Sequence, residues 1–343
     1  MSKKFAILIC KTVLSVGILG YLFHSARSTE QFHDLSAEDL SWGWLGMAIV
    51  LCITAHVVSY LRWRVMVRAL GIPFNIYDAV RIGFIGSFFN LFAFGVVGGD
   101  SLRAFYVARQ IKHRVPEVIA SVLADRMIGL LTMFSFASAA FLLTDIAHFG
   151  KTANPQKTQA MITACRFIVT ATFVGYSGLI ALLFIPRLTQ TKGFKQLTAM
   201  PKLGPIIDRL AQVLIVYQKR KRALGSCFLL SAVMVVCFAS SIFSIALAIN
   251  ESHPSLAQHF IITPISMTAN AIPLPGGIGG MELALDFLYQ AFASSSGNQR
   301  AIIIAFTFRF VLLMTSAIGA VAWFFHRKRE GNKNRETLES EKE

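Results

Sequence analysis

Six long apolar segments constrain what this chain can fold into more than any other feature of its sequence. A helix needs about 20 consecutive apolar residues to cross the hydrocarbon core of a bilayer. Segments of about that length are Phe5–Phe23, Gly43–Leu61, Val118–Leu143, Cys165–Ile185, Cys227–Ile249 and Ala301–Phe325. Only 15% of the residues are charged, whereas a soluble domain carries about a quarter. The sequence therefore predicts an all-α polytopic membrane protein with six full spans.

The distribution of Lys and Arg predicts how these spans are oriented, because basic loops stay in the cytoplasm. The segment 186–226 holds nine basic residues and a single acid, Asp208, and the stretch "HRKRE" follows the last span. In contrast, His24–Trp42 contains one Arg and four acids. We therefore expect both termini and the segment 186–226 to be cytoplasmic.

Two shorter apolar regions, Val80–Val97 and Leu256–Leu274, each run into a glycine-rich break. Basic residues flank the first region on both sides, so the chain enters from the cytoplasm and returns there. The second region must begin and end outside for the last span to finish at "HRKR". Each region is predicted to be a re-entrant hairpin. If both regions cross instead, the protein has eight spans.

In this topology the chain uses one unit twice, with every direction reversed. The first membrane repeat covers residues 1–143 and the second covers 165–325, which includes the basic loop 186–226. Residues 144–164 form an external loop, and 326–343 a cytoplasmic tail. The motifs "SFFNLFAFGVVGGD" and "SMTANAIPLPGGIGGME" both run from Ser through Asn and a Gly-Gly pair to an acid. Inverted repeats with broken helices are typical of transporters, although coincidence between two glycine-rich loops is the alternative.

The glycine breaks are predicted to open short helices at membrane depth. Helix N-termini carry free N–H groups and partial positive charge, which suit a phosphate. The candidate phosphate-binding glycines are Gly98, Gly99, Gly276, Gly277, Gly279 and Gly280. Asn90 and Asn270 precede the two breaks and are candidates for lining a polar cavity. A tight turn that packs two helices together is the alternative for either break.

Arginines inside the predicted spans are the second set of candidates. A charge at the centre of a lone helix costs about 2.5–3.5 kcal/mol, so Arg126 and Arg309 should face a cavity or pair with acids. With Arg103, they are predicted to hold a lipid phosphate, since a guanidinium matches its oxygens. Acids predicted to balance these charges or to contact an amine are Asp100, Asp125, Glu282 and Asp286. Purely structural ion pairs are the alternative.

Cofactor motifs are absent from the sequence. It contains no nucleotide phosphate loop, no HExxH, no GxSxG and no zinc-ligand spacing, so we expect no cofactor and no metal. The basic cluster Lys219, Arg220, Lys221 and Arg222 ends an apolar-faced helix and is predicted to bind anionic membrane lipids. Docking of a separate lipid-modifying enzyme is the alternative, and nucleic acid is not expected as a partner.

Four motifs together resemble a known family. They are "FFNLFAFGVVGGDSLRAFYVARQ", "VLADRMIGLL", "NAIPLPGGIGGMELAL" and the late "FRF", in a resemblance that extends over Phe5–Phe325. The chain is similar to the membrane, flippase-like domain of lysylphosphatidylglycerol synthases. This resemblance implies a multi-pass protein of a prokaryotic plasma (inner) membrane. In fused members it implies movement of an aminoacylated lipid between leaflets, and we expect a stand-alone member without the soluble synthase domain.

Three functions are compatible with these features. The leading one is a lipid translocase or scramblase for an anionic or phosphate-linked lipid. An integral-membrane transferase is the second, with Asp100 or Glu282 as the general base. The third is an accessory subunit for a separate lipid-modifying enzyme. The absence of catalytic motifs favours a protein that is not an enzyme.

Overall fold

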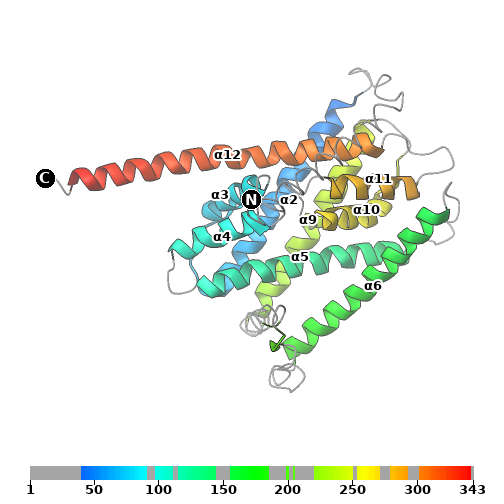
Figure 1. Ribbon diagram of the computed structural model, residues 1–343, viewed down its shortest axis with the longest axis horizontal. Coiled ribbons are helices and arrows are strands. Elements are labelled where there is room, and N and C mark those ends of the chain that lie inside the picture. The colour runs from blue at the N-terminus through cyan, green and yellow to red at the C-terminus, as the bar shows by residue number, and fades with distance from the viewer. Residues whose placement is uncertain are drawn as a thin grey trace, which may run out of the picture.

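The computed structural model describes residues 40–90, 97–110, 115–143, 155–184, 198–200, 204, 220–249, 253–270, 279–292 and 301–340. These residues are almost entirely helical, as Figure 1 shows. The helices are α2 Trp42–Ala69, α3 Ile76–Asn90, α4 Val97–Gln110, α5 Val115–Leu143, α6 Pro155–Phe184, α9 Lys221–Ala248, α10 Leu256–Ala269, α11 Gly280–Phe292 and α12 Ala301–Ser340. The all-α prediction is confirmed.

Among the described residues, five helices are long and apolar enough to cross a membrane. They contain the stretches Trp42–Ala69, Glu117–Leu143, Gln159–Gly178, Arg222–Ala248 and Ala301–Phe324. These coincide with five predicted spans, whereas Phe5–Phe23 lies outside the described residues. The chain is therefore an integral, multi-pass membrane protein.

Helix α6 begins at Pro155, earlier than the predicted Cys165. Proline suits a first helical position, because its fixed φ fits the helix and its missing N–H has no partner there anyway. The second part of the predicted external loop is therefore helical. Residues 144–154 of that loop lie outside the described part of the chain.

The two hairpin regions each contain a pair of short helices. Helices α3 and α4 have 15 and 14 residues, and α10 and α11 have 14 and 13. At a rise of about 1.5 Å per residue, each is about 20 Å long, shorter than the hydrocarbon core of about 30 Å. Helix α3 packs against α4, and α10 packs against α11, as a re-entrant hairpin requires. The number of spans stays a prediction.

The two halves of the chain exchange packing partners. Helix α12 of the second half packs on α3 of the first, and α5 of the first half packs on α10 of the second. Helix α2 of the first half packs antiparallel against α9 of the second half. Ser41 N–H donates to the Ala248 carbonyl at 3.0 Å, and Ser241 Oγ donates to the Ala48 carbonyl at 2.8 Å. An inverted repeat predicts this reciprocity, and the repeat itself stays a prediction.

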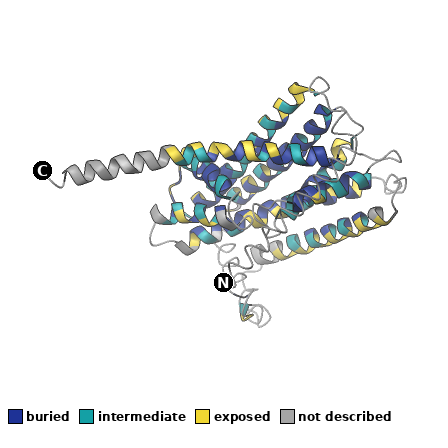
Figure 2. Cartoon of the chain, turned by 45° about the horizontal axis from the view of Figure 1, so that its top comes forward, coloured by how far each residue is buried: buried dark blue, intermediate teal, exposed yellow. Residues whose placement is uncertain are grey.

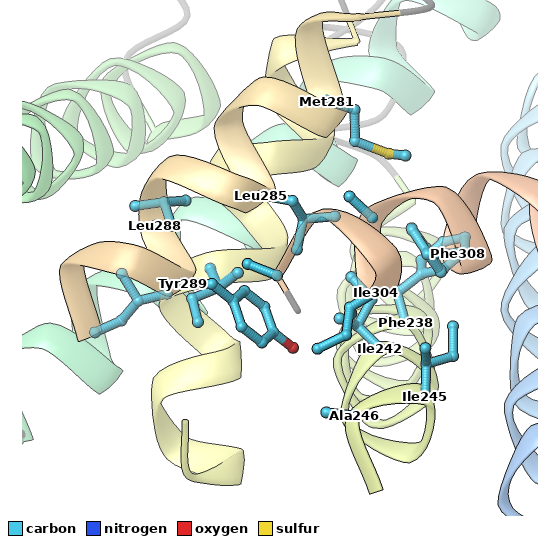
Figure 3. Packing of buried hydrophobic residues seen from close by; sticks show 14 of the residues in the cluster. Phe238, Ile242, Ile245, Ala246, Met281, Leu285, Leu288, Tyr289, Ile304 and Phe308 are labelled. Carbon is cyan, nitrogen blue, oxygen red and sulfur yellow. The ribbon is translucent and has the colours of Figure 1, made fainter. Parts of the chain in front are cut away.

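The core lies where the two halves meet. Figure 2 shows that buried residues line the inner faces of the helices, and Figure 3 shows side chains of α9, α11 and α12 packed together. On the periphery, Phe167 and Phe173 of α6 are 71% and 75% exposed. Large apolar side chains in that position are suited to contact with lipid rather than water.

Candidate functional site

The first hairpin is built on close contact between backbones. A Cβ added to Gly99 of α4 would lie 2.0 Å from the Gly86 carbonyl oxygen of α3, so the two helices cross with no side chain between them. On another part of α3, a Cβ at Gly83 would lie 2.3 Å from Cγ of Tyr60. Small residues in membrane helices commonly permit such crossings. Here the glycines open a slot that holds the Tyr60 ring and the Arg103 side chain.

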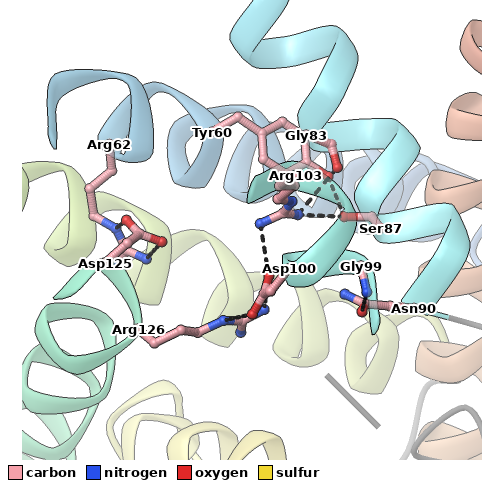
Figure 4. A network of polar contacts seen from close by, with 10 residues as sticks. All are labelled: Tyr60, Arg62, Gly83, Ser87, Asn90, Gly99, Asp100, Arg103, Asp125 and Arg126. Atoms are coloured by element: carbon pink, nitrogen blue, oxygen red, sulfur yellow. Dashed lines mark hydrogen bonds and ion pairs between the residues drawn. The ribbon is translucent and has the colours of Figure 1, made fainter. Parts of the chain in front are cut away.

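Arg103 fills this slot and is buried. Its Nη2 donates to the Gly83 carbonyl at 3.2 Å and to Ser87 Oγ at 3.1 Å, as Figure 4 shows. Its guanidinium carbon lies 5.0 Å from the centre of the Tyr60 ring, within range of a cation–π interaction. Nε of Arg103 is buried and finds no hydrogen-bond partner among the described residues.

Asp100 lies between two arginines. It accepts hydrogen bonds from Arg126 Nε at 2.7 Å and Arg126 Nη2 at 2.9 Å, and it lies 3.5 Å from Arg103 Nη1. Its place in the first turn of α4 adds the favourable helix dipole. The Arg126 side chain is 43% exposed, whereas that of Asp100 is 13% exposed. Arg126 is therefore the accessible member of the cluster.

A second buried ion pair joins α2, α5 and α9. Arg62 Nε and Nη2 donate to the two oxygens of Asp125 at 2.7 and 3.0 Å, and Arg62 Nη1 donates to Ser231 Oγ at 2.8 Å. Gly129 leaves room for this arginine, since an added Cβ would lie 2.8 Å from Nη1. Asp125 directly precedes Arg126, so the pair fixes the rotation of α5 and thereby the position of Arg126.

These side chains carry unequal charge. Arg62, Arg103 and Arg126 bring three positive charges to the cluster, and Asp100 and Asp125 bring two negative charges. We call these five residues the first-half cluster. Its excess of one positive charge within the membrane region favours an anion, because an uncompensated charge there is costly.

The second half contains a more enclosed pair. Arg309 Nε and Nη2 donate to the two oxygens of Glu282, and Nη2 also donates to Asn270 Oδ1 at 3.2 Å. Glu282 Oε2 accepts the Gly279 N–H at 2.9 Å. Gly279 has a φ of 99°, which only glycine adopts readily. We call Asn270, Gly279, Glu282 and Arg309 the second-half cluster.

The predicted site residues are thus divided between two clusters. Asp100, Arg103 and Arg126 are brought together in the first, with Asp125 beside them, and Glu282 and Arg309 form the second. Asp286 instead accepts a hydrogen bond from Gln290 at 2.8 Å on α11.

Two of the predicted phosphate-binding glycines have their N–H groups engaged. Gly99 N–H donates to Asn90 Oδ1 at 2.7 Å, and Gly279 N–H donates to Glu282. Gly98 and Gly280 lie in the first turns of α4 and α11. Gly276 and Gly277 lie outside the described residues.

Sequence reasoning missed Tyr60, Arg62, Gly83 and Ser87. Arg62 directly follows the apolar segment Gly43–Leu61, where a basic residue is expected to flank the membrane, but α2 continues to Ala69. The spacing of Gly83 and Ser87 is a small-xxx-small pattern, which indicates close helix packing. That pattern could have drawn attention to the slot.

Comparisons with known proteins agree with this architecture. A sequence model of the lysylphosphatidylglycerol synthase TM region matches residues 8–319. The chain is also similar to UPF0104 membrane protein PH1989 of Pyrococcus horikoshii, with 24% identity over 274 residues, which covers 76% of this chain and 80% of that protein. This protein belongs to the family defined by the lysylphosphatidylglycerol synthase transmembrane region.

Proposed function

We propose that this protein moves a lipid with an anionic, phosphate-linked head group between the two leaflets of its membrane. The observation that carries the proposal is the first-half cluster, in which three arginines face only two carboxylates. A phosphodiester carries one negative charge and would neutralise this excess. Guanidinium groups also match phosphate oxygens in geometry as well as in charge.

Arg126 is the group that meets the phosphate in this proposal. Its side chain is 43% exposed although its Nε and Nη2 are bonded to Asp100. Arg103 lies behind Asp100 and keeps that carboxylate partly neutralised when Arg126 turns towards a ligand. The apolar segment 5–23 contains Lys11 and no carboxylate, so it cannot supply the missing negative charge.

The family and the helix arrangement support movement rather than simple binding. The chain belongs to a family of membrane proteins named for a lipid synthase, and its short helix pairs lie in both halves. Transporters built from inverted repeats place substrates where such broken helices meet. Rocking of the two halves would expose the head-group site to one leaflet and then to the other.

The geometry of the acids favours a translocase over a transferase. Asp100 and Glu282 each accept hydrogen bonds from one arginine through both oxygens. A general base needs an oxygen within reach of the proton that it removes. In this structure both carboxylates are held in ion pairs instead.

The basic start of α9 has a supporting part in this proposal. Arg220 and Arg222 are exposed at the beginning of that helix, and Lys219 lies outside the described residues. We place this end of α9 among anionic head groups of the cytoplasmic leaflet, where each basic residue contributes about 1 kcal/mol of attraction.

The test is lipid movement in liposomes that contain the purified protein and fluorescent phosphatidylglycerol. Dithionite added outside bleaches only the outer leaflet, so further loss of fluorescence reports movement. Arg126→Ala should reduce the protein-dependent rate at least about tenfold, which corresponds to loss of about 1.4 kcal/mol. Arg166→Ala is the matched control, because Arg166 is exposed on α6, a helix that contributes no residue to either cluster. An equal rate in wild type, Arg126→Ala and protein-free liposomes would disprove the proposal.

A further inference from the structure

Helix α10 contains two buried hydroxyl groups without a hydrogen-bond partner. Thr263 Oγ1 and Ser266 Oγ are fully buried and find no partner among the described residues. Other hydroxyls in these helices behave differently, since Thr132 and Thr268 each donate to the carbonyl four residues earlier at 2.8 and 2.7 Å. A buried hydroxyl without a partner costs about 1–3 kcal/mol, so two of them in adjacent turns require an explanation.

A proline in the same turn adds a third oxygen. Pro264 lies inside α10 and has no N–H, so the Phe260 carbonyl lacks its usual helical donor. Thr263 and Ser266 are three residues apart and share one face of the helix. A carbonyl points along the helix axis towards the following turn, so the Phe260 oxygen is directed to the turn that holds Thr263. Two unpartnered hydroxyl oxygens and one carbonyl oxygen without its helical donor therefore lie within two turns of α10.

The first hairpin shows what occupies the equivalent place. The residue numbers of α3 and α10 differ by the same amount at both ends of the helix. Ile76 and Leu256 begin the two helices, and Asn90 and the C-cap residue Asn270 end them. With this offset, Thr263 and Ser266 correspond to the two glycines of α3 that form the Arg103 slot. In α3 that slot holds a guanidinium group, bonded to the Gly83 carbonyl and in close contact with Gly86.

The second hairpin has no arginine to fill this place. Arg103 follows Asp100 by three residues, and the residue that follows Glu282 by three is Leu285. Leu285 is fully buried in the apolar core. Where the first half has a fixed cation next to two glycines, the second half has two hydroxyls and a carbonyl.

We propose that α10 binds a monovalent metal cation through Thr263 Oγ1, Ser266 Oγ and the Phe260 carbonyl oxygen. Neutral oxygen atoms suit a hard cation, and divalent cations normally need carboxylates as well. Glu282 of the adjacent helix α11 is engaged by Arg309 and the Gly279 N–H. Carbonyl groups released by broken helices bind Na⁺ in other transporters.

The cation would equalise the charge of the two halves. The first-half cluster has one excess positive charge, and the Glu282–Arg309 pair has none. A bound monovalent cation gives the second half the same excess. Both halves would then have the same net charge when they bind an anionic head group. Binding of the cation would thus be linked to binding of the lipid, which makes it a coupling ion. This role rests on the proposed function, whereas cation binding itself does not.

The test measures the thermal unfolding midpoint of the full-length protein in detergent. NaCl is compared with choline chloride at equal ionic strength, and KCl and LiCl are added as further probes. A cation that binds only the folded state raises the midpoint in a concentration-dependent way. We expect an alkali cation to raise the midpoint of wild type and to lose this effect in Thr263→Val/Ser266→Ala. Equal midpoints in all salts, or an effect retained in the double variant, would overturn the site.

Two variants keep the result interpretable. Thr268→Val removes a hydroxyl of the same helix that already has a partner, the Pro264 carbonyl, and should keep the cation effect. Ser266→Ala alone removes one atom and serves if the double variant does not fold. For Ser266→Ala the direct measurement is binding of radioactive ²²Na⁺. The affinity should fall at least about tenfold, because one good ligand is lost. Unchanged ²²Na⁺ binding would count against the proposal.

The two proposals fail separately. Arg126→Ala removes the proposed phosphate contact and leaves α10 unchanged, so its unfolding midpoint should keep the cation effect. Lipid movement without any cation effect would overturn the α10 site alone. A cation effect without lipid movement in liposomes would overturn the proposed function alone.

Discussion

The Asp100–Arg126 and Glu282–Arg309 pairs have the same chemistry in different surroundings. Each joins the first turn of a short helix to the following long helix. The Arg126 side chain is 43% exposed, but that of Arg309 is only 11% exposed and its carboxylate partner is fully buried. The first pair is therefore accessible in this structure and the second is enclosed. The proposed alternation between two inverted halves would require such an asymmetry in any one state.

The largest expected difference between the pairs is in their effect on stability. Arg309→Ala leaves Glu282 buried without its main cation and should cost about 3–5 kcal/mol. Arg126→Ala removes a partly exposed arginine whose partner keeps Arg103, so it should cost about 0–1 kcal/mol. Unfolding in detergent, followed by circular dichroism, measures both.

A charge-neutral double variant sharpens this result. Replacement of a buried ion pair by apolar groups of similar volume is often neutral. Glu282→Leu/Arg309→Met should therefore recover most of the stability that Arg309→Ala loses. If Arg126→Ala destabilises the protein as much as Arg309→Ala, the two pairs do not differ as their exposure indicates.

The second prediction concerns the glycine contact of the first hairpin. Gly99→Ala places a methyl group 2.0 Å from the Gly86 carbonyl, and the resulting overpacking should cost about 1–3 kcal/mol. Gly178→Ala in α6 is the control, because nothing lies within 4 Å of its added Cβ. Alanine is the better helix former by about 1 kcal/mol, so the control should be neutral or slightly stabilising. Equal unfolding midpoints for both variants would contradict the close crossing of α3 and α4.

The third prediction compares the accessibility of the two arginine positions. Cysteine at position 126 should react with a membrane-impermeant maleimide at least about tenfold faster than cysteine at position 309, because reaction requires access. Cys52, Cys165, Cys227 and Cys237 are buried, and wild-type protein gives the background. Arg309→Cys should become more reactive only in a state in which the second-half pair is accessible and the first-half pair is enclosed. Equal labelling rates at the two positions would show that the described asymmetry is absent in solution.

The sequence predicted the contacts that the membrane environment makes necessary. Arg126 and Arg309 lie in apolar helices, where an unpaired charge is too costly, and each is paired with an acid. Asp100 and Arg103 are also three residues apart, a spacing that places them on one helical face. Helix class and the short helix pairs followed from apolar segment length and the glycine breaks.

Contacts between distant helices could not be predicted in the same way. The Arg62–Asp125 pair depends on α2 continuing past its apolar segment, and the Arg103 slot depends on how α3 crosses α2 and α4. Glu282 and Asp286 share a face of α11 by spacing. Glu282 meets Arg309 of α12, and Asp286 accepts a hydrogen bond from Gln290 of its own helix. The contact between α11 and α12 brings the Glu282 carboxylate to Arg309, and the spacing within α11 does not predict that contact.

The exchange of α5 and α12 between the halves has a consequence for the origin of the chain. Helix α3 is covered by α12, and α10 is covered by α5, so neither half encloses its own short helices. If the chain were cut between α6 and α9, each fragment would have to find the other in the bilayer to become complete. With the inverted repeat that the sequence predicts, a gene of half this length would give a complete protein only if two copies were inserted in opposite directions and assembled as a pair.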